Sequence, residues 1–287
     1  MTRLSTIIPV FNRQVSAERA MRSALEQHVD GAEVVVVDDG SQPPFEIPPD
    51  LRSGNVHLFR HAVNKGAAAA RNTGVQAARG DWIAFLDSDD YWIPSTLSQR
   101  LETAERDFTA EPSILVAYAA GYVLYDESKG RRETRVPRAS DKPLDFASGC
   151  WFSPGSTLLL RKQIFQQIGP FDTTLRRLED FDWFLRFANA GGRLSIWPNT
   201  AAMIEIGPRP DLAIVEDTTR RLDAKYARGR HRLSASQTRR LRAYLDLERA
   251  SAHVARARWI SAVYYMLRSL IRVPRRSLHL KQFWDIN

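Results

Sequence analysis

The feature that most constrains the fold of this chain is an alternation of strand-like and helix-like segments over its first 92 residues. The strand-like runs, apolar and rich in β-branched residues, are 4–10, 33–37, 56–59 and 82–86, and the segments with helical spacing between them are 14–27 and 66–78. Continuous apolar strands joined by helices are typical of a parallel sheet covered on both faces. We therefore expect an α/β fold whose ligands bind beyond the carboxyl ends of its strands.

Polar clusters follow three of the strand-like runs, at Phe11–Arg13, Asp38–Ser41 and Asp87–Asp90. The last cluster ends the segment DWIAFLDSDD, in which an apolar run leads directly into three carboxylates. Like charges at the end of a buried strand are costly unless a cation or hydrogen-bond donors compensate them. In extended backbone Asp87 and Asp89 would share one side, and such oxygen ligands suit Mg²⁺ or Mn²⁺. A solvated turn or a helix N-cap is the alternative interpretation.

Two further clusters are weaker signals. The segment Asp38–Ser41 offers two acids and a glycine at a strand end, and a carboxylate there could accept a hydrogen bond from the N3–H of uracil, but these four residues also make an ordinary turn. Lys65 and Gly66 precede a helix that carries Arg71, and this arrangement favours an anion or a base carbonyl nearby. The spacing matches neither a P-loop nor a dinucleotide-binding glycine motif.

Beyond residue 92 the pattern becomes mixed. We expect a helix over 94–108, strands over 114–125 and 156–160, an exposed hairpin or loop over 129–141, and a helix over 178–190 that ends at a glycine pair. The last helix begins with Glu179 and Asp180. Taken alone, these acids indicate a simple acidic first turn that caps the helix.

The single cysteine, Cys150, excludes an intrachain disulfide and a thiol cluster for zinc. The N-terminal apolar run is only about seven residues long, too short for the core of a signal peptide or for a membrane span. We therefore expect a cytoplasmic protein, with peripheral attachment to the inner face of a membrane as an alternative.

Charge divides the chain unevenly. Residues 208–287 hold 18 Lys and Arg against 7 Asp and Glu, a net charge of +11, which leaves −3 for residues 1–207. This indicates a core with a basic, mostly helical C-terminal extension. Its aromatic-rich segment 259–271 is too short to span a bilayer and has basic flanks. It could dock on the core, form a homodimer, or lie on a membrane surface. We expect no nucleic-acid partner.

Taken together, the motifs are more specific. The segments IIPVFNR, VVVVDDGS, NKGAAAARNTGVQAARG and DWIAFLDSDD occur in this order, and LEDFDWFLRF follows. This combination closely resembles the family 2 glycosyltransferases. The resemblance implies an inverting enzyme with a GT-A fold, a Rossmann-like, mostly parallel sheet flanked by helices. It also implies a catalytic domain over 1–207, with a nucleotide-binding half over about 1–92 and an acceptor half over about 93–207, before the helical extension 208–287.

The resemblance also implies the donor, a nucleotide-diphosphate sugar, with a UDP-sugar expected. Pro9 and Phe11 match positions that pack against the base, and Asp39 matches the residue that binds uracil. Arg71 matches a basic residue near the nucleotide, and Lys65 is a softer assignment to the same site.

The remaining implied roles concern the metal and the acceptor. Asp87 and Asp89 match the outer members of the DxD motif, with Asp87 nearer the ribose and metal-bound water and Asp89 as the direct ligand of Mg²⁺ or Mn²⁺. Asp180 matches the catalytic base, and Glu179 would help orient the acceptor, a glycan, a lipid-linked molecule or another hydroxyl compound. Cell-envelope or polysaccharide synthesis is the expected setting.

One departure concerns a late histidine. Many family members carry a histidine 20 to 40 residues beyond the acidic helix, but the corresponding stretch here has none. His231 is the late candidate, and Arg209, Arg228 or Arg230 could stabilise the leaving diphosphate instead. Two other functions stay open: a nucleotidyltransferase that makes sugar nucleotides, which the missing Gly-rich loop after the first strand disfavours, and a non-catalytic nucleotide-binding protein of the same fold.

Overall fold

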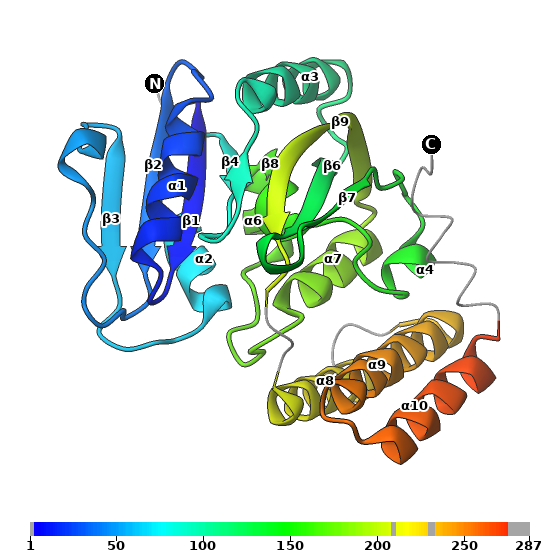
Figure 1. Ribbon diagram of the computed structural model, residues 1–287. Helices are drawn as coiled ribbons and strands as arrows, with labels where there is room; N and C mark the ends of the chain where they lie inside the picture. The colour runs from blue at the N-terminus through cyan, green and yellow to red at the C-terminus, as the bar shows by residue number, and fades with distance from the viewer. Residues whose placement is uncertain (1–2, 208–210, 229–232, 275–287) are drawn as a thin grey trace.

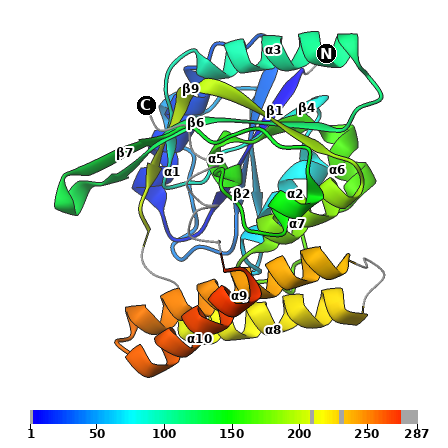
Figure 2. The ribbon, with the colours of Figure 1, turned by 90° about the vertical axis from the view of Figure 1, so that its right-hand side faces the viewer.

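A computed structural model describes residues 3–207, 211–228 and 233–274 of the chain. It contains an α/β sheet structure and a layer of C-terminal helices that lies against one end of it (Figures 1 and 2). His231, Arg209 and Arg230 lie outside the described residues, and the side chain of Arg228 is not described either. The predictions for these four residues therefore stay predictions.

In the described chain, nine strands form one mixed sheet. Its order is β3-β2-β1-β4-β8-β6-β9-β5, and β7 pairs with β6. The strands are β1 (Leu4–Val10), β2 (Ala32–Asp38), β3 (Val56–Arg60), β4 (Trp82–Phe85), β5 (Tyr91–Trp92), β6 (Val116–Asp126), β7 (Arg131–Arg135), β8 (Leu159–Arg161) and β9 (Arg193–Glu205). The first four strands along the chain are parallel, so their carboxyl ends meet at one edge. The predicted α/β fold is confirmed.

Helices cover both faces of the sheet, as Figure 2 shows. They are α1 (Gln14–Leu25), α2 (Ala67–Ala77), α3 (Thr96–Ala110), α4 (Pro143–Phe146), α5 (Pro154–Thr157), α6 (Lys162–Ile168) and α7 (Glu179–Asn189). Successive strand residues point to opposite faces, so Val34 and Val36 enter the core under α1 while Val35 and Val37 enter the core under α2. This is why the sequences of β1 and β2 are continuous apolar runs.

Some sequence-based expectations need correction. Residues 154–157 form the short helix α5, so the strand predicted over 156–160 begins only at Leu159. The backbone after β4 does not stay extended: a turn includes residues 88–89, closed by a 3.0 Å hydrogen bond from Asp90 N to Asp87 O. The sequence pattern did not predict strand β9, because the alternation of apolar and polar residues along it is interrupted by Pro198 and by a bulge opposite Gly121. The hairpin predicted over 129–141 is confirmed by the pairing of β7 with β6.

The C-terminal helices are α8 (Leu212–Arg228), α9 (Ala235–Ala255) and α10 (Trp259–Arg272). An apolar cluster joins α7 to α8 and α9, with contributions from Phe181, Leu185, Leu222, Tyr226, Leu241 and Leu245. A polar contact adds to it, because Asp182 of α7 is fully buried and accepts a 2.9 Å hydrogen bond from the Tyr226 hydroxyl. The helical layer is therefore held against α7 by apolar and polar contacts.

Within the described residues, no helix combines the length and the apolar character that crossing a bilayer requires.

Candidate active site

A cavity of about 320 Å³ opens at the carboxyl ends of the parallel strands, and we call it the strand-end cavity. The residues predicted from sequence that line it are Pro9, Phe11, Asp39, Arg71, Asp87 and Asp89. They come from the end of β1, from helix α2 and from the loops after β1, β2 and β4, and they are brought together because these three strands run parallel and side by side. The three polar clusters thus meet at one edge of the sheet, as expected of such folds.

Asp39 is buried at the base of this cavity, where its carboxylate holds the loop that leads into α2. The backbone N–H groups of Lys65 and Gly66 donate to its two oxygens over 2.9 and 2.7 Å. His61 Nδ1 lies 2.6 Å from Oδ1, and the other ring nitrogen contacts Thr73. Because Gly66 is the one donor to Oδ2 among the described residues, this oxygen can accept another hydrogen bond from a ligand. His61 is a positioning residue that no sequence motif indicated.

Asp87 lies under the guanidinium of Arg71, whose Nη2 is 2.6 Å from Asp87 Oδ1. The backbone N–H of Asp87 donates to the Ser156 hydroxyl over 3.1 Å. Gly155, in α5, packs so closely that a Cβ atom at this position would collide with the Asp87 carboxylate. No sequence pattern singled out Gly155, because its role depends on α5 packing against the end of β4.

Asp89 and Asp90 point in different directions, although they are adjacent. The Asp89 carboxylate lines the cavity and forms an ion pair with Arg13. Asp90 is buried, where it accepts hydrogen bonds from the Ser156 hydroxyl and from the backbone N–H of Glu205, the latter over 2.9 Å. Burial and the nearby charge of Asp87 raise the pKa of Asp90 well above its usual range. Asp90 therefore connects the turn to α5 and β9.

The carboxylates of Asp87 and Asp89 fit a divalent cation that arrives with a ligand. They face one cavity, and hard oxygen ligands suit Mg²⁺ or Mn²⁺. Among the described residues, no cluster of three or more Asp, Glu, His or Cys side chains could hold an ion by itself. Magnesium commonly takes one or two carboxylates and completes its shell with phosphates and water. In the structure Arg71 and Arg13 compensate the two acids.

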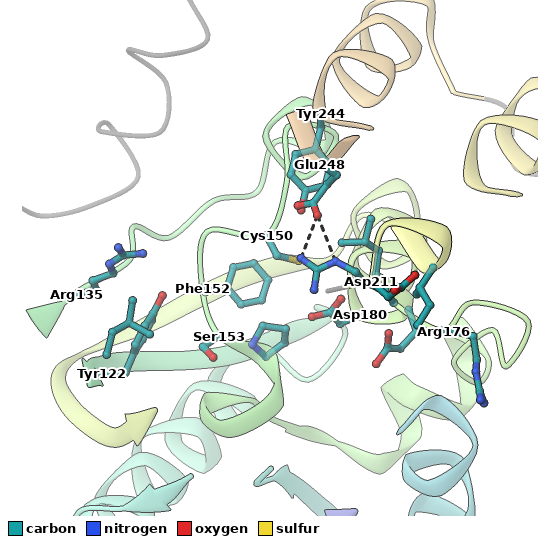
Figure 3. Close-up of a pocket in the computed structure, with 16 residues that line it drawn as sticks. Tyr122, Arg135, Cys150, Phe152, Ser153, Arg176, Asp180, Asp211, Tyr244 and Glu248 are labelled. Atoms are coloured by element: carbon teal, nitrogen blue, oxygen red, sulfur yellow. Dashed lines mark hydrogen bonds and ion pairs between the residues drawn. The ribbon is translucent and has the colours of Figure 1, made fainter. Parts of the chain in front are cut away.

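A second cavity of about 590 Å³ lies between the sheet structure and the C-terminal helices. We call it the acid-pair cavity, because Glu179 and Asp180 line it at the N-terminus of α7. Figure 3 shows Asp180 directed into this space, with Tyr244 and Glu248 reaching toward it from α9. Two acids that sequence motifs indicated thus share a cavity with residues more than 60 positions later in the chain.

The side chain of Arg71 joins the two cavities. Its Nη1 lies 2.7 Å from Glu179 Oε1, while its Nη2 contacts Asp87. Burial by itself lowers the pKa of this guanidinium, but the two carboxylates hold the pKa above its ordinary value. A planar guanidinium can bond two carboxylates at fixed geometry, which an ammonium cannot. The positions of Asp87 and Glu179 are therefore coupled.

Asp180 has a different environment from Glu179. Its carboxylate accepts a 2.7 Å hydrogen bond from the backbone N–H of Phe181, and no residue of the described chain forms a salt bridge with it. Burial, followed by the charge of Glu179, raises the pKa of Asp180 to about 6. At neutral pH the group is mostly ionised, yet it is far more basic than an ordinary aspartate. Such a carboxylate is suited to accept a proton.

The C-terminal helices supply walls of the acid-pair cavity that the sequence did not indicate. Arg177 donates to Glu248 Oε2 through Nη2 over 3.0 Å, drawn as dashed lines in Figure 3. Tyr244 is packed against Phe181, with ring centroids 4.8 Å apart. Tyr244 and Glu248 belong to α9, a helix without a recognisable motif, so only the packing of α9 on α7 reveals their place in the cavity.

The Lys65 side chain and most of the nearby aromatic side chains do not line the cavities. The Lys65 side chain is exposed and does not line the strand-end cavity, so only its backbone contributes to the site. Four nearby aromatic residues, Trp151, Phe152, Trp183 and Phe184, belong to the core under α2, and of these Phe152 also lines the acid-pair cavity. Large buried aromatic side chains contribute mainly to core packing.

Comparison with known sequences gives a family match and curated relatives. Residues 5–169 match the model of Glycosyl transferase family 2. An uncharacterized glycosyltransferase from Haemophilus influenzae is 29% identical over 187 residues, which cover 64% of this chain and 61% of that protein. The pre-mycofactocin glycosyltransferase of Mycobacterium tuberculosis is 29% identical over 200 residues, covering 68% and 41% of the two chains. The chain thus spans about three-fifths or less of these relatives.

Solved structures resemble the whole fold. The crystal structure of S. aureus TarS 1-349 in complex with UDP-GlcNAc has a TM-score of 0.61 and 16% sequence identity, and the match covers 98% of this chain and 92% of that one. A second structure of TarS 1-349 has a TM-score of 0.59 and 16% identity, with 98% and 89% coverage. At this identity the likeness concerns the fold, which is of the GT-A type and includes the C-terminal helices.

Proposed function

Because this chain belongs to glycosyl transferase family 2, we propose that it is an inverting glycosyltransferase that uses a nucleotide-diphosphate sugar. A UDP-sugar is the proposed donor, and UDP-GlcNAc is the first to test, because a TarS structure with the same fold contains it. The acceptor is proposed to be a hydroxyl of a glycan or of a lipid-linked molecule, in cell-envelope or polysaccharide synthesis.

The observation that carries this proposal is the contact of Arg71 with both cavities. Asp87 belongs to the strand-end cavity and Glu179 to the acid-pair cavity, and the Arg71 guanidinium bonds both over 2.6 and 2.7 Å. A transferase must bring a donor and an acceptor together at one point. Two adjacent cavities, one lined by predicted nucleotide-binding residues and the other by a basic carboxylate, fit this requirement.

The proposed reaction is a single displacement at the anomeric carbon. Asp180 takes the proton of the acceptor hydroxyl while the acceptor oxygen bonds to that carbon and the bond to the diphosphate oxygen breaks. The electron pair of the broken bond leaves with the nucleoside diphosphate. The pKa of Asp180, although raised to about 6, still lies below neutral pH, so the carboxylate is mostly ionised and is a stronger base than an ordinary aspartate. Glu179 would help orient the acceptor.

The leaving diphosphate needs positive charge on the donor side. Asp89 and Asp87 would hold Mg²⁺ or Mn²⁺, which when bound supplies such charge to the phosphates. Pro9 and Phe11 would pack against the base, and Asp39 Oδ2 would accept from it. Arg71 would retain Asp87 in position while the ion binds. Arg13 pairs with one oxygen of Asp89, Oδ2, and the other oxygen would be the one available to the metal.

The arrangement of the whole chain is proposed in the same way. Residues 1–207 would form the catalytic domain, and 208–287 the helical extension, which contributes Asp211, Tyr244 and Glu248 to the acid-pair cavity. Peripheral membrane contact and a homodimer through these helices are the two proposed associations of the extension.

Calorimetry with UDP tests the donor site. We expect UDP to bind the wild-type protein about tenfold more tightly with Mn²⁺ than with EDTA, since metal and nucleotide bindings are reciprocally coupled. With Asp89→Ala, UDP should bind equally tightly in Mn²⁺ and in EDTA. Glu102→Ala removes the same charge from an exposed position on α3 and should leave the ratio unchanged.

The outcomes separate the candidate functions. Absence of metal-dependent binding of any nucleoside diphosphate would remove the transferase proposal. Metal-dependent binding without release of UDP from a panel of UDP-sugars would favour a non-catalytic binding protein. Formation of a UDP-sugar from UTP and a sugar phosphate would favour a nucleotidyltransferase instead. The panel also identifies the sugar, because discrimination between hexoses depends on the shape of the cavity.

A further inference from the structure

Helix α10 presents an apolar stripe to the solvent. Its most exposed apolar side chains are Ile260, which is 90% exposed, Ile271 at 79% and Trp259 at 62%. The stripe continues with other exposed large side chains, namely Val263, Tyr264, Met266, Leu267 and Leu270. Figure 2 shows α10 on the outer side of the helical layer, alongside α9. A contiguous exposed patch of this kind marks an interaction site.

The inward face of α10 explains why the stripe points outward. Ala262 and Ser269 are the residues of this helix that are buried, and the Ser269 hydroxyl donates to the Ala243 carbonyl of α9 over 2.7 Å. Arg272 and Arg268 are turned toward Asp246 of α9. The helix therefore packs on the protein with small and charged residues and with Tyr265, which stacks on His253 of α9, and leaves its other large apolar residues in water, the reverse of an ordinary surface helix.

Charge distinguishes the possible occupants of this stripe. Residues 256–274 contain four arginines and no acid, and residues 208–287 carry a net charge of +11. A second copy of the chain would bring the same positive charge to the contact and would be repelled. An anionic lipid surface is complementary to this charge and attracts each basic residue that lies near it. Trp259 and Tyr264 are side chains that favour the membrane–water interface.

We propose that α10 lies flat on an anionic membrane, with its apolar stripe among the lipid chains and the exposed Arg256 and Arg258, which precede the helix, near the headgroups. The proposal goes beyond the proposed transfer reaction and does not depend on it. It rests on the orientation of α10, its exposed side chains and the charge of the extension.

Co-sedimentation of the full-length chain with vesicles tests this proposal. We expect binding at low salt to vesicles of phosphatidylcholine and phosphatidylglycerol at a ratio of about 7:3, and little binding to pure phosphatidylcholine. The double variant Ile260→Glu/Ile271→Glu should bind the anionic vesicles at least about tenfold more weakly, because it removes apolar contact and adds repulsion. Both residues are largely exposed, so the fold should be retained.

A matched control carries the same added charge elsewhere. Gln99→Glu/Thr109→Glu changes two exposed residues of α3, at the opposite end of the molecule from α10 in Figure 1. It should bind vesicles within about twofold of wild type, since the interaction between the added charges on α3 and the lipid headgroups is screened over a Debye length. Equal loss in both double variants would reduce the effect to net charge and overturn the proposal.

Two other results would also overturn it. One is a lack of binding of the wild-type chain to anionic vesicles at low salt. The other is a wild-type chain that does not bind lipid and is a dimer by light scattering, which Ile260→Glu/Ile271→Glu converts to a monomer. A second copy of the chain would then cover the stripe. Calorimetry with UDP on the same variant keeps this test separate from that of the donor site, because UDP binding should be unchanged.

Discussion

The strand-end cavity and the acid-pair cavity are adjacent but are built in different ways. The lining of the first comes from residues 9–89, whereas that of the second extends from Tyr122 to Glu248. Loops at neighbouring parallel strands create the first cavity almost independently of the rest of the chain. The second exists only because α7, α8 and α9 pack against the sheet structure. Local motifs therefore encode one cavity, and tertiary packing creates the other.

The electrostatics of the two cavities differ as well. In the strand-end cavity Asp87 and Asp89 each pair with an arginine, so positive charge already faces both carboxylates. In the acid-pair cavity Asp180 has no such ion pair within the described chain, and burial together with Glu179 raises its pKa to about 6. The first arrangement suits the binding of ions and phosphates, and the second suits proton transfer.

The largest expected effect comes from Asp180→Asn, which should separate the cavities cleanly. Without the carboxylate the proposed acceptor of the proton is lost, so release of UDP from UDP-GlcNAc, with water as acceptor, should fall about 10³-fold. UDP affinity measured by calorimetry should stay within about twofold of wild type, because the strand-end cavity is untouched. Near-normal turnover would place the base elsewhere, and a parallel loss of UDP affinity would contradict the separation of the two cavities.

Arg71→Lys should affect both cavities at once. Lysine keeps the charge but cannot bond Asp87 and Glu179 together, and one hydrogen bond to a charged group contributes about 1.5–3 kcal/mol. We expect kcat/KM for UDP release to fall roughly 10- to 100-fold and UDP binding to weaken.

The control for this variant is Arg60→Lys, which alters the ion pair with buried Asp38 outside the lining of either cavity. It should change kcat/KM by less than about threefold, since lysine keeps the positive charge beside Asp38 and neither residue lines a cavity. If Arg71→Lys altered turnover alone, Arg71 would belong to the acid-pair cavity and not to both.

The pH dependence should also distinguish the cavities. Asp180 works as a base only when ionised, and its pKa is raised, so activity should be lost as pH falls through about 6. Below that pH, kcat/KM should decrease about tenfold per unit, and Asp180→Asn should lack this limb. The terminal phosphate of UDP ionises near the same pH, so the comparison is between proteins: UDP binding should show the same pH dependence in wild type and in Asp180→Asn. A difference between the two in UDP binding would couple the titration of Asp180 to the strand-end cavity.

The smallest effects are shifts of that limb. The charge of Glu179 is the second cause of the raised pKa of Asp180, after burial, so Glu179→Gln should move the limb to lower pH. Arg177 lowers the same pKa, but less than Arg71 does, so Arg177→Gln should move the limb upward by a smaller amount. Both midpoints can be measured from pH profiles of UDP release. Shifts in the same direction would show that neighbouring charges do not control Asp180.

The strand-end cavity could be predicted well because each of its elements carries its own local pattern. Apolar β-branched runs predicted β1, β2 and β4, and the rule that ligands bind at the carboxyl ends of parallel strands placed Asp39 and Asp87 together. The resemblance to family 2 glycosyltransferases pointed to Asp180 through a motif on α7. In these cases the local pattern was sufficient, because each residue directly follows a predicted strand or begins a predicted helix.

What the sequence could not predict depends on distant packing. Arg13 meets Asp89 only because the backbone turns at residues 88–89, where the acids alone indicated extended chain and a metal ion. Asp90 belongs to the same acidic cluster, yet its burial requires β9, which arrives more than 100 residues later. Tyr244 and Glu248 lie on α9, a helix whose sequence resembles any amphipathic helix.

Helix α7 is shared by two hydrophobic cores. Trp183 and Phe184 are part of the core under the sheet, while Phe181 and Leu185 are part of the core formed with α8 and α9. Its burial on opposite sides makes its folding cooperative with both parts of the molecule. A local opening of the C-terminal helices would therefore release one face of α7 and disorder the acid pair, while β1, β2 and β4 could keep their hydrogen bonds. The proposed proton acceptor, Asp180, is thus held in position only when both the sheet structure and the C-terminal helices are folded.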